Sequence, residues 1–371
     1  MKAIITGGGT GGHIYPALSI SKALLKQDWQ VLYVGSIGGL EGKIIPPENI
    51  PYREVAGAYL PRKLTPRLLS ALLKTARGLL QARQLIKQYQ PDLVLGTGGF
   101  VAGPVVLAAS LAGIKTVIHE QNIYPGFTNR LLASRVDRIA LNFKGAAQYF
   151  PRKSQDKLVV TGNPIREVIL TTERSQGIKE LDLVEHKKTM LVFGGSQGAQ
   201  SINDAMIPVY KKYSQANWLQ IIHLTGLNNY EQVLKQLRTS GINLTEQDHY
   251  KILPYLDKME LAYAVADLII YRAGATGLAE ITAKGIPAIL IPYPYSAENH
   301  QEYNARNLAE KGAAIVINQQ DLTGDLLKAE IQGLFRDQAR LTVMSSNSKK
   351  IGKPAAVADI IEMIKEIVDA K

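Results

Sequence analysis

Residues 7–13 read Gly-Gly-Gly-Thr-Gly-Gly-His and directly follow a short apolar run, Ala-Ile-Ile, at residues 3–5. A second turn of this kind, Gly-Gly-Ser-Gln-Gly-Ala at residues 194–199, follows Met-Leu-Val-Phe at residues 190–193. Each pattern predicts a buried strand, a tight turn and then a helix. Such a turn points backbone N–H groups and the positive end of a helix dipole at an anion, usually a phosphate. The chain is therefore predicted to be an α/β protein with two Rossmann-like domains that face a cleft holding a phosphorylated substrate.

The rest of the chain alternates between strand and helix signals. In the first half we predict strands at Ala3–Thr6, Gln30–Val34, Leu93–Leu95, Thr116–His119, Arg138–Leu141 and Leu158–Val160, and helices at Tyr15–Lys26, Pro66–Tyr89, Pro104–Ala112 and Thr128–Ala133. In the second half we predict strands at Thr189–Phe193, Leu219–Leu224, Leu268–Tyr271, Ala288–Ile291 and Ala314–Ile317, helices at Gly277–Ala283, Gln301–Glu310 and Ala355–Val368, and a polar surface connection at Ser175–Lys188. This alternation is typical of parallel sheets with right-handed crossovers. Gly-Asn-Pro at residues 162–164 interrupts it and marks the expected domain boundary.

The composition limits the class of protein. A chain of 371 residues is long enough for two domains, and 46% hydrophobic with 20% charged residues is ordinary for a globular protein. There is no cysteine, which excludes disulfides and thiolate metal sites. No apolar stretch approaches the roughly 20 residues that a membrane-spanning helix needs, and we expect no signal peptide.

The basic residues are concentrated in the first half of the chain. Residues 1–165 contain 20 Lys and Arg against 8 Asp and Glu, and the whole chain carries a net charge of +11. This asymmetry predicts a polyanion or an anionic membrane surface as a partner. An RNA-binding protein would explain the charge, but the chain lacks the clustered aromatic residues expected for base stacking. We therefore expect no nucleic-acid partner.

The segment Thr65–Tyr89 is both cationic and amphipathic. Two interpretations are open: a crossover helix with a solvated basic face, or a patch that lies on anionic lipid. No acid occurs between Glu54 and Asp92, whereas seven bases do. This favours the membrane patch, with Arg67, Lys74 and Arg77 among its bases.

The first glycine-rich turn formally satisfies G-x-G-x-x-G, which alone is a weak sign of dinucleotide binding. A nicotinamide site would also need an acid at the end of the second strand, where the sequence has Gly35-Ser36. A nucleoside-triphosphate loop would need a lysine where His13 stands. A third interpretation is that these glycines only allow the helix to pack on the strand. An NAD(P)-dependent oxidoreductase nevertheless stays the alternative to a transferase.

Polar groups also follow other predicted strands. Gly-Thr-Gly-Gly at residues 96–99 and His119–Asn122 follow strands of the first half, and in open α/β sheets ligands lie at this edge. Glu280, early in a predicted helix, is either a ligand of a ribose diol or a helix-dipole partner. The chain has no D-x-D or H-E-x-x-H motif, so we expect no metal. The charge on a leaving diphosphate would then be met by N–H groups, helix dipoles and arginine.

Seven segments together resemble the MurG family, the bacterial undecaprenyldiphospho-muramoylpentapeptide N-acetylglucosaminyltransferases, in their order and spacing. They are residues 7–13, 96–100, 119–122, 162–166, 194–199, 272–280 and 300–304. The resemblance covers nearly the whole chain and implies a two-domain GT-B fold. It implies inverting, metal-independent transfer of GlcNAc from UDP-GlcNAc to the MurNAc 4-hydroxyl of lipid I, which gives lipid II for peptidoglycan synthesis, and it implies no cofactor.

The resemblance also assigns residues. His13 matches a proposed catalytic histidine. The alternative is that His13 only hydrogen-bonds the loop or the acceptor's diphosphate, in which case Glu120 or His119 is the next candidate for the base. The positions that match UDP-GlcNAc contacts are Thr10, Gly11, Gly12, Asn122, Arg166, Ser196, Ala275, Thr276, Glu280 and Gln301. Two positions depart from the family: Phe100 stands where many members have tyrosine, and Gly277 where a hydroxyl residue is common.

The family's organisation implies domains and a location. Residues 1–164 would form an acceptor- and membrane-binding domain, with the C-terminal segment 346–371 packing back onto it. Residues 165–345 would form the UDP-GlcNAc-binding domain. The protein would be peripheral, on the cytoplasmic face of the cell membrane, with UDP-GlcNAc, lipid I, anionic lipid and other cell-wall synthesis proteins as its partners.

Overall fold

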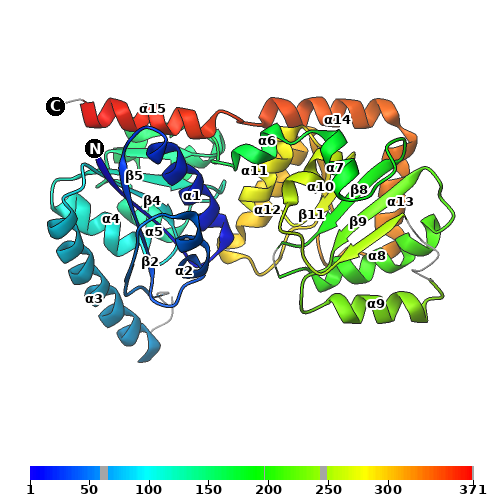
Figure 1. The fold of residues 1–371 in the computed structure, drawn as a ribbon, viewed down its shortest axis with the longest axis horizontal. Helices are drawn as coiled ribbons and strands as arrows, with labels where there is room; N and C mark the ends of the chain where they lie inside the picture. The colour runs from blue at the N-terminus through cyan, green and yellow to red at the C-terminus, as the bar shows by residue number, and fades with distance from the viewer. Residues whose placement is uncertain (59–65, 196, 243–248, 370–371) are drawn as a thin grey trace. The chain divides into compact units, whose positions relative to one another are not determined.

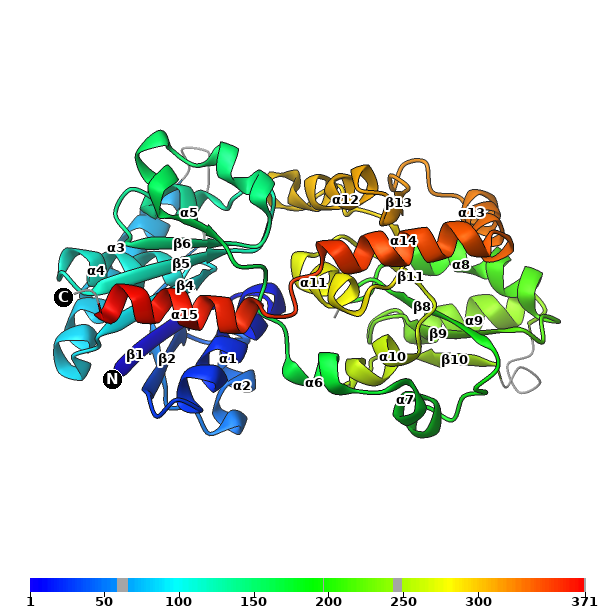
Figure 2. The same cartoon turned by 90° about the horizontal axis from the view of Figure 1, so that it is seen from above.

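The chain folds into two compact units. The computed structural model describes residues 1–58, 66–195, 197–242 and 249–369, and gives the backbone alone for residues 66–68. The first unit comprises Met1–Arg166 and Lys353–Lys371, and the second comprises Glu167–Gly352 (Figures 1 and 2). Each unit is built on one parallel sheet, which confirms the α/β class with two Rossmann-like units.

The sheet of the first unit has seven parallel strands in the order β3-β2-β1-β4-β5-β6-β7. They are β1 (Lys2–Gly7), β2 (Gln30–Ser36), β3 (Tyr52–Val55), β4 (Leu93–Gly98), β5 (Lys115–Glu120), β6 (Arg138–Leu141) and β7 (Leu158–Val160). Six of them were predicted. The edge strand β3 was missed because the exposed Arg53 and Glu54 at its centre give it no apolar alternation.

Helices cover both faces of this sheet. They are α1 (Gly11–Leu25), α2 (Glu41–Ile44), α3 (Pro66–Tyr89), α4 (Ala102–Leu111), α5 (Phe127–Leu132) and α15 (Ala356–Asp369). Successive residues of β1 alternate between two cores: Ala3 and Ile5 pack with α1 and α15, whereas Ile4 packs with α3, α4 and α5. Since side chains of a strand point to opposite faces in turn, both faces of the sheet are buried. The C-terminal helix α15 therefore completes the core of the first unit, beside α1 (Figure 2).

The second unit repeats the arrangement with six parallel strands in the order β10-β9-β8-β11-β12-β13. The strands are β8 (Lys188–Phe193), β9 (Leu219–Leu224), β10 (Tyr250–Leu253), β11 (Leu268–Tyr271), β12 (Ala288–Leu290) and β13 (Ala314–Val316). The helices are α6 (Glu167–Thr171), α7 (Arg174–Glu180), α8 (Gln200–Tyr213), α9 (Tyr230–Thr239), α10 (Met259–Val265), α11 (Ala275–Lys284), α12 (His300–Glu310), α13 (Gly324–Arg336) and α14 (Gln338–Ile351). The edge strand β10 was also missed.

Two expected boundaries differ from the structure. The predicted surface connection Ser175–Lys188 contains most of α7, which lies against α10 through Gly177; a Cβ there would lie 2.6 Å from the Val265 side chain. Because this helix packs through a glycine, its sequence lacks the apolar periodicity that would have predicted a helix. Residues 346–352 were expected with the first unit but belong to the second, since Ser345 and Ser348 of α14 donate hydrogen bonds to the carbonyls of Gly285 and Ile286.

The long helix α3 packs on the sheet through both small and large residues. Its buried positions are Ala71, Gly78, Ala82 and Ile86, and a Cβ on Gly78 would overlap the carbonyl of Ala56. The large leucines at positions 69, 72, 73 and 80 are 48–68% exposed instead. We expected some leucines of this helix to face the sheet. The structure bears this out for Leu79 and Leu85, which pack against the core beside the buried Ile86, whereas the leucines at positions 69, 72, 73 and 80 form an apolar stripe on the outside.

Truncating a core side chain of α15 should destabilise the first unit. Ile364 is fully buried in the core shared with α1, so Ile364→Ala should lower the free energy of unfolding by about 2–5 kcal/mol. The chain has two tryptophans, and a Trp218→Phe background leaves the buried Trp29 to report urea unfolding of the first unit. The exposed neighbour Glu366→Ala is the control. Equal midpoints for the two variants would mean that α15 is not part of this core.

Candidate active site

The first glycine-rich turn joins β1 to α1 by close backbone contact with the loop after β4. Gly8 N donates to Gly98 O at 3.3 Å, and a Cβ on Gly99, whose φ is +82°, would overlap the Gly8 carbonyl. Tyr33 donates its hydroxyl to Gly7 O at 2.7 Å from the neighbouring strand. Thr10 is the N-cap residue of α1 in extended conformation, and Gly11 and Gly12 form the first turn of that helix. The glycines therefore serve close packing of two loops as well as the helix start.

His13 lies half-buried directly behind this turn. Its Nδ1 is 3.1 Å from the carbonyl oxygen of Gly8 and 3.4 Å from the Thr10 hydroxyl. A carbonyl oxygen can only accept, so the shorter contact favours a proton on Nδ1. The basic lone pair of the neutral ring is then on Nε2. The ring lies against Gly98, where a Cβ would be 2.8 Å from Cδ2 and 3.0 Å from Nε2. The loop thus fixes both the tautomer and the place of the imidazole.

A buried carboxylate that the sequence did not reveal holds the same turn. Glu41, the first residue of α2, accepts from Ser36 N at 2.7 Å, from Ser36 Oγ at 2.5 Å and from Gly9 N at 3.1 Å. Burial alone would raise the pKa of Glu41, but these hydrogen bonds outweigh it and hold the pKa below its usual value. No motif signals this contact, because Glu41 is neither on a strand nor at the position of a ribose-binding acid.

Glu120 lies at the end of β5 and is fully engaged by its own loop. Its carboxylate accepts from Asn122 N at 2.9 Å and Asn122 Nδ2 at 3.2 Å, and from Gly126 N at 2.9 Å and Asn129 Nδ2 at 2.8 Å. Burial nevertheless raises the pKa of Glu120 above its usual value. These four contacts favour a role in holding the loop that carries Asn122 over the role of a base.

His119 is equally enclosed. Its Nε2 donates to Gly162 O at 2.9 Å, and its Nδ1 accepts from Gln121 Nε2 at 3.0 Å. Both ring nitrogens are occupied, and burial lowers the pKa of His119 to about 4. The neutral imidazole therefore connects β5 to the backbone at Gly162 by a hydrogen bond. Further along the chain, the Arg166 guanidinium lies over the Tyr15 ring, 5.7 Å from its centroid.

In the second unit Arg272 connects the loops at the carboxyl edge of the sheet. It follows β11 and donates to Ile291 O at 3.1 Å, to Ser201 Oγ at 2.9 Å and to Gln319 Oε1 at 2.7 Å. Its guanidinium also lies 5.4 Å from the Tyr293 ring centroid. Burial lowers the pKa of Arg272, although a guanidinium stays charged at neutral pH. This positive charge therefore lies buried beneath the predicted donor-binding loops.

Helix α11 begins beside Arg272 and presents the predicted ribose and diphosphate groups. Ala275 and Thr276 form its first turn, and Glu280 is buried one turn later. Gly277 faces the ring of Tyr271, where a Cβ would lie 2.6 Å from the ring atoms. Tyr271 stacks on Phe193 with ring centroids 4.3 Å apart. The glycine at position 277 thus has a steric cause within this chain.

Gln301 and Asn304 of α12 hold the backbone of the same loop. Gln301 Oε1 accepts from Ala273 N at 3.3 Å and Tyr293 N at 2.9 Å, and Asn304 Nδ2 donates to Ala273 O at 3.2 Å. The structure thus brings Ala275, Thr276, Glu280 and Gln301 to adjoining helix starts. Ser196 lies outside the described residues.

The second glycine-rich turn packs against the loop after β9. A Cβ on Gly226, at φ +88°, would lie 2.5 Å from Gln197 O. Asn203 of α8 supports that loop from below: its Nδ2 donates to Thr225 O at 3.1 Å, and its Oδ1 accepts from His223 Nε2 at 3.0 Å. Burial lowers the pKa of His223 to about 3, so this buried contact stays neutral.

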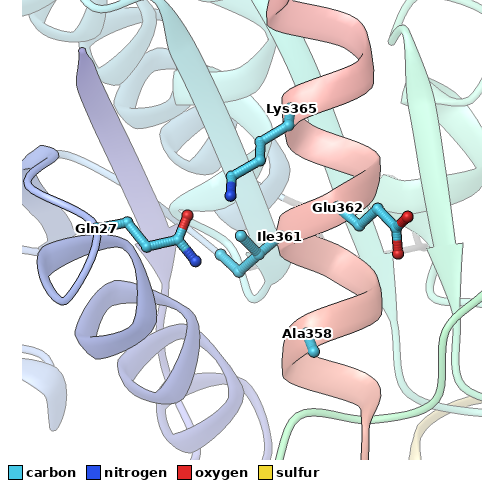
Figure 3. Close-up of a pocket in the computed structure, with 5 residues that line it drawn as sticks. All are labelled: Gln27, Ala358, Ile361, Glu362 and Lys365. Carbon is cyan, nitrogen blue, oxygen red and sulfur yellow. The ribbon is translucent and has the colours of Figure 1, made fainter.

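One shallow surface hollow of about 450 Å³ lies away from these loops. It is lined by Gln27, Ala358, Ile361, Glu362 and Lys365 (Figure 3). Gln27 and Lys365 point toward one another across it, whereas Glu362 points away. Gln27 precedes β2, so the hollow lies at the amino edge of the sheet, opposite to the carboxyl edge where ligands bind.

Two findings bear on metals and membranes. In the parts of the chain that the structure describes, no group of three or more His, Asp or Glu is placed to hold a metal ion. Across the same residues, no helix combines the length and apolar character needed to cross a bilayer.

Known proteins match this chain over its whole length. A protein from Halothermothrix orenii, named UDP-N-acetylglucosamine–N-acetylmuramyl-(pentapeptide) pyrophosphoryl-undecaprenol N-acetylglucosamine transferase, is 56% identical over 99% of both chains. The chain belongs to the MurG family. A MurG-family relative of the same name from Desulforamulus reducens is 45% identical, again over 99% of both chains. The names of these relatives do not support the oxidoreductase alternative.

Family profiles and solved structures agree with membership of the MurG family. The glycosyltransferase family 28 N-terminal domain matches residues 3–141, and the family 28 C-terminal domain matches residues 189–363. A crystal structure of Acinetobacter baumannii MurG aligns with a TM-score of 0.77 and 31% identity, over 98% of this chain and 99% of that chain. The predicted GT-B fold is thereby confirmed.

The buried His119 should make the first unit less stable in acid. The folded-state pKa of about 4 lies below the ordinary value of 6.5, so its contribution is complete above pH 6.5 and is lost as the pH falls toward 4. In the Trp218→Phe background, urea unfolding should show a slope of up to about 1.4 kcal/mol per pH unit from this group. An imidazole ¹⁵N titration of His119, assigned with His119→Asn, checks the cause. A midpoint near 6.5 would contradict it.

Proposed function

We propose that this chain transfers GlcNAc from UDP-GlcNAc to the MurNAc 4-hydroxyl of lipid I, giving lipid II and UDP. The observation that carries the proposal is 56% identity over essentially the full length to a relative of that named activity. The second-unit loops support it, since Gln301 holds the backbone of Ala273 next to the buried Arg272, and Thr276 and Glu280 lie on the helix that begins just after it. The first unit would bind the acceptor and the second unit the donor.

His13 is the proposed general base. As the 4-hydroxyl oxygen attacks the anomeric carbon, its proton passes to Nε2, the C1–O bond to UDP breaks, and the configuration inverts. The Nδ1–H contact to Gly8 O supports this role, because it keeps the lone pair on Nε2. Glu120 and His119 are assigned positioning roles, since their polar atoms are engaged within the protein.

The donor is proposed to bind chiefly through the second unit. The Glu280 carboxylate would accept from the ribose hydroxyls, and the Gln301 amide and the Ala275–Thr276 turn would meet the nucleotide's polar groups. Thr10, Gly11, Gly12, Asn122, Arg166 and Ser196 are further proposed contacts on the family pattern. The leaving diphosphate would be met by N–H groups and helix dipoles without a metal.

We also propose that α3 attaches the protein to the cytoplasmic face of the membrane. Four leucines at positions 69, 72, 73 and 80 are exposed on this helix, beside the exposed Lys74 and Arg77. Transfer of a large apolar side chain from water into the membrane interface lowers the free energy, and attraction between a nearby base and anionic lipid lowers it further. The side chain of Arg67, predicted to join this patch, lies outside the described residues.

The direct test is turnover in the presence of a chelator. Purified protein with UDP-GlcNAc and lipid I should form lipid II at an unchanged rate in excess EDTA. A rate that collapses in EDTA and returns with magnesium would contradict the metal-independent reaction. No lipid II under any condition would refute the proposed function.

His13 and Glu280 should separate catalysis from donor binding. His13→Ala should lower kcat roughly 10²–10⁴-fold with UDP affinity little changed, because only the proton acceptor is lost. Glu280→Ala should weaken UDP binding in isothermal titration by on the order of 1–3 kcal/mol, because charge-assisted hydrogen bonds are lost. The reverse pattern, or a kcat in His13→Ala equal to the parent's, would refute these assignments.

Membrane binding should depend on the bases of α3. Lys74→Gln with Arg77→Gln should reduce co-sedimentation with anionic vesicles at low salt, each base contributing about 1 kcal/mol. Lys211→Gln with Lys212→Gln, on exposed positions of α8, removes the same charge from the other unit and is the matched control. Equal vesicle binding by both double variants would make α3 an ordinary crossover helix.

A further inference from the structure

We propose that Glu41 is a positioning residue that orients the His13 imidazole through a single peptide group, the one between Gly8 and Gly9. The inference rests on the proposed role of His13 in transfer. Glu41 holds the N–H end of this peptide at 3.1 Å, and His13 Nδ1 lies 3.1 Å from its carbonyl end. Because a peptide group is planar, fixing one end fixes the direction of the other.

This peptide group would have little intrinsic preference for its orientation. It lies between two glycines, and Gly9 has φ of +84°. Glycine adopts positive and negative φ with similar ease, so the two residues themselves resist rotation of this peptide plane only weakly. Gly99 packs against the Gly8 carbonyl, and Glu41 holds the N–H end, so the two contacts together keep the carbonyl facing His13.

The surroundings of Glu41 are built for a carboxylate. The residue is fully buried, and Ser36 supplies two further donors to Oε1 from the end of β2. Glycines occupy three neighbouring positions, 8, 35 and 39, where a Cβ would overlap or crowd the Glu41 side chain. Two strand-end loops thus close around one acid.

The negative charge should also strengthen the contact with His13. A carboxylate that accepts from the peptide N–H polarises the peptide and makes its carbonyl a better acceptor. This favours Nδ1–H and the positive ring that forms when Nε2 takes the proton. Glu41 thus acts on the imidazole as an acid does in a carboxylate–histidine pair, with a peptide group inserted between them.

The test is Glu41→Gln in a double-mutant cycle with His13→Ala. Glutamine keeps the size of the side chain but offers one acceptor oxygen where three donors converge. Turnover should fall on the order of 10–100-fold in kcat, while the KM for UDP-GlcNAc and the affinity for UDP stay unchanged. In the His13→Ala background, Glu41→Gln should lower kcat by less than about 2-fold, because the two residues act as one unit. Multiplicative effects, or a parental kcat in folded Glu41→Gln, would overturn the proposal.

A matched control and a second measurement separate positioning from stability. Glu48→Gln removes the next acid of the chain, which pairs with Lys22 at the surface, and should keep the parental kcat. In the parent protein, ¹⁵N spectra assigned with His13→Ala should show neutral His13 protonated on Nδ1. Protonation on Nε2 instead would overturn the proposal even if Glu41→Gln does not fold. The two proposals can fail separately. If the parent protein forms no lipid II, the proposed function is refuted. If its His13 is nevertheless protonated on Nδ1, and this tautomer is lost in Glu41→Gln, the positioning role of Glu41 is still supported.

Discussion

Close contact between strand-end loops is the constraint on which both units depend. A parallel sheet delivers the carboxyl ends of all its strands to one edge, and the loops there must pass one another backbone to backbone. In the first unit Gly8 meets Gly98 and Gly99, and in the second Gly226 meets Gln197. A side chain at these positions would force the loops apart. The glycines that suggest phosphate binding in the sequence are thus required by the packing of the loops, whether or not a ligand is bound.

The polar and charged groups at the carboxyl edge of each sheet fall into two kinds. Arg272, Glu120 and Glu41 are buried, and each uses its hydrogen-bonding groups on loops of its own unit. Since an unpaired buried charge is costly, such residues are fixed in place and fix their neighbours. His13 is half-buried, and Thr10 and Thr276 are at least partly accessible. In each unit, accessible groups of the candidate site are therefore held by a deeper layer of immobile ones.

The sequence was sufficient for the central strands, the helices α1, α3, α4, α5, α11, α12 and α15, and the loops that carry the candidate site, because buried parallel strands are short apolar runs. It was insufficient for β3 and β10, whose edge positions leave them half exposed. The same limit applies to Glu41, whose partners are backbone groups of residues 9 and 36 that no spacing rule connects. The nitrogens of His119 and the oxygens of Glu120 could not be assigned either, because only the fold shows what encloses them.

The pair formed by Tyr271 and Gly277 has a consequence for what position 277 can carry in this chain. The tyrosine ring occupies the volume that a side chain at position 277 would need, and it is held there by its stack on Phe193. A side chain at position 277 of this chain would therefore require the Tyr271 ring to move, and moving that ring would break its stack on Phe193. The start of α11 is thus coupled to the core of the second unit through one aromatic ring.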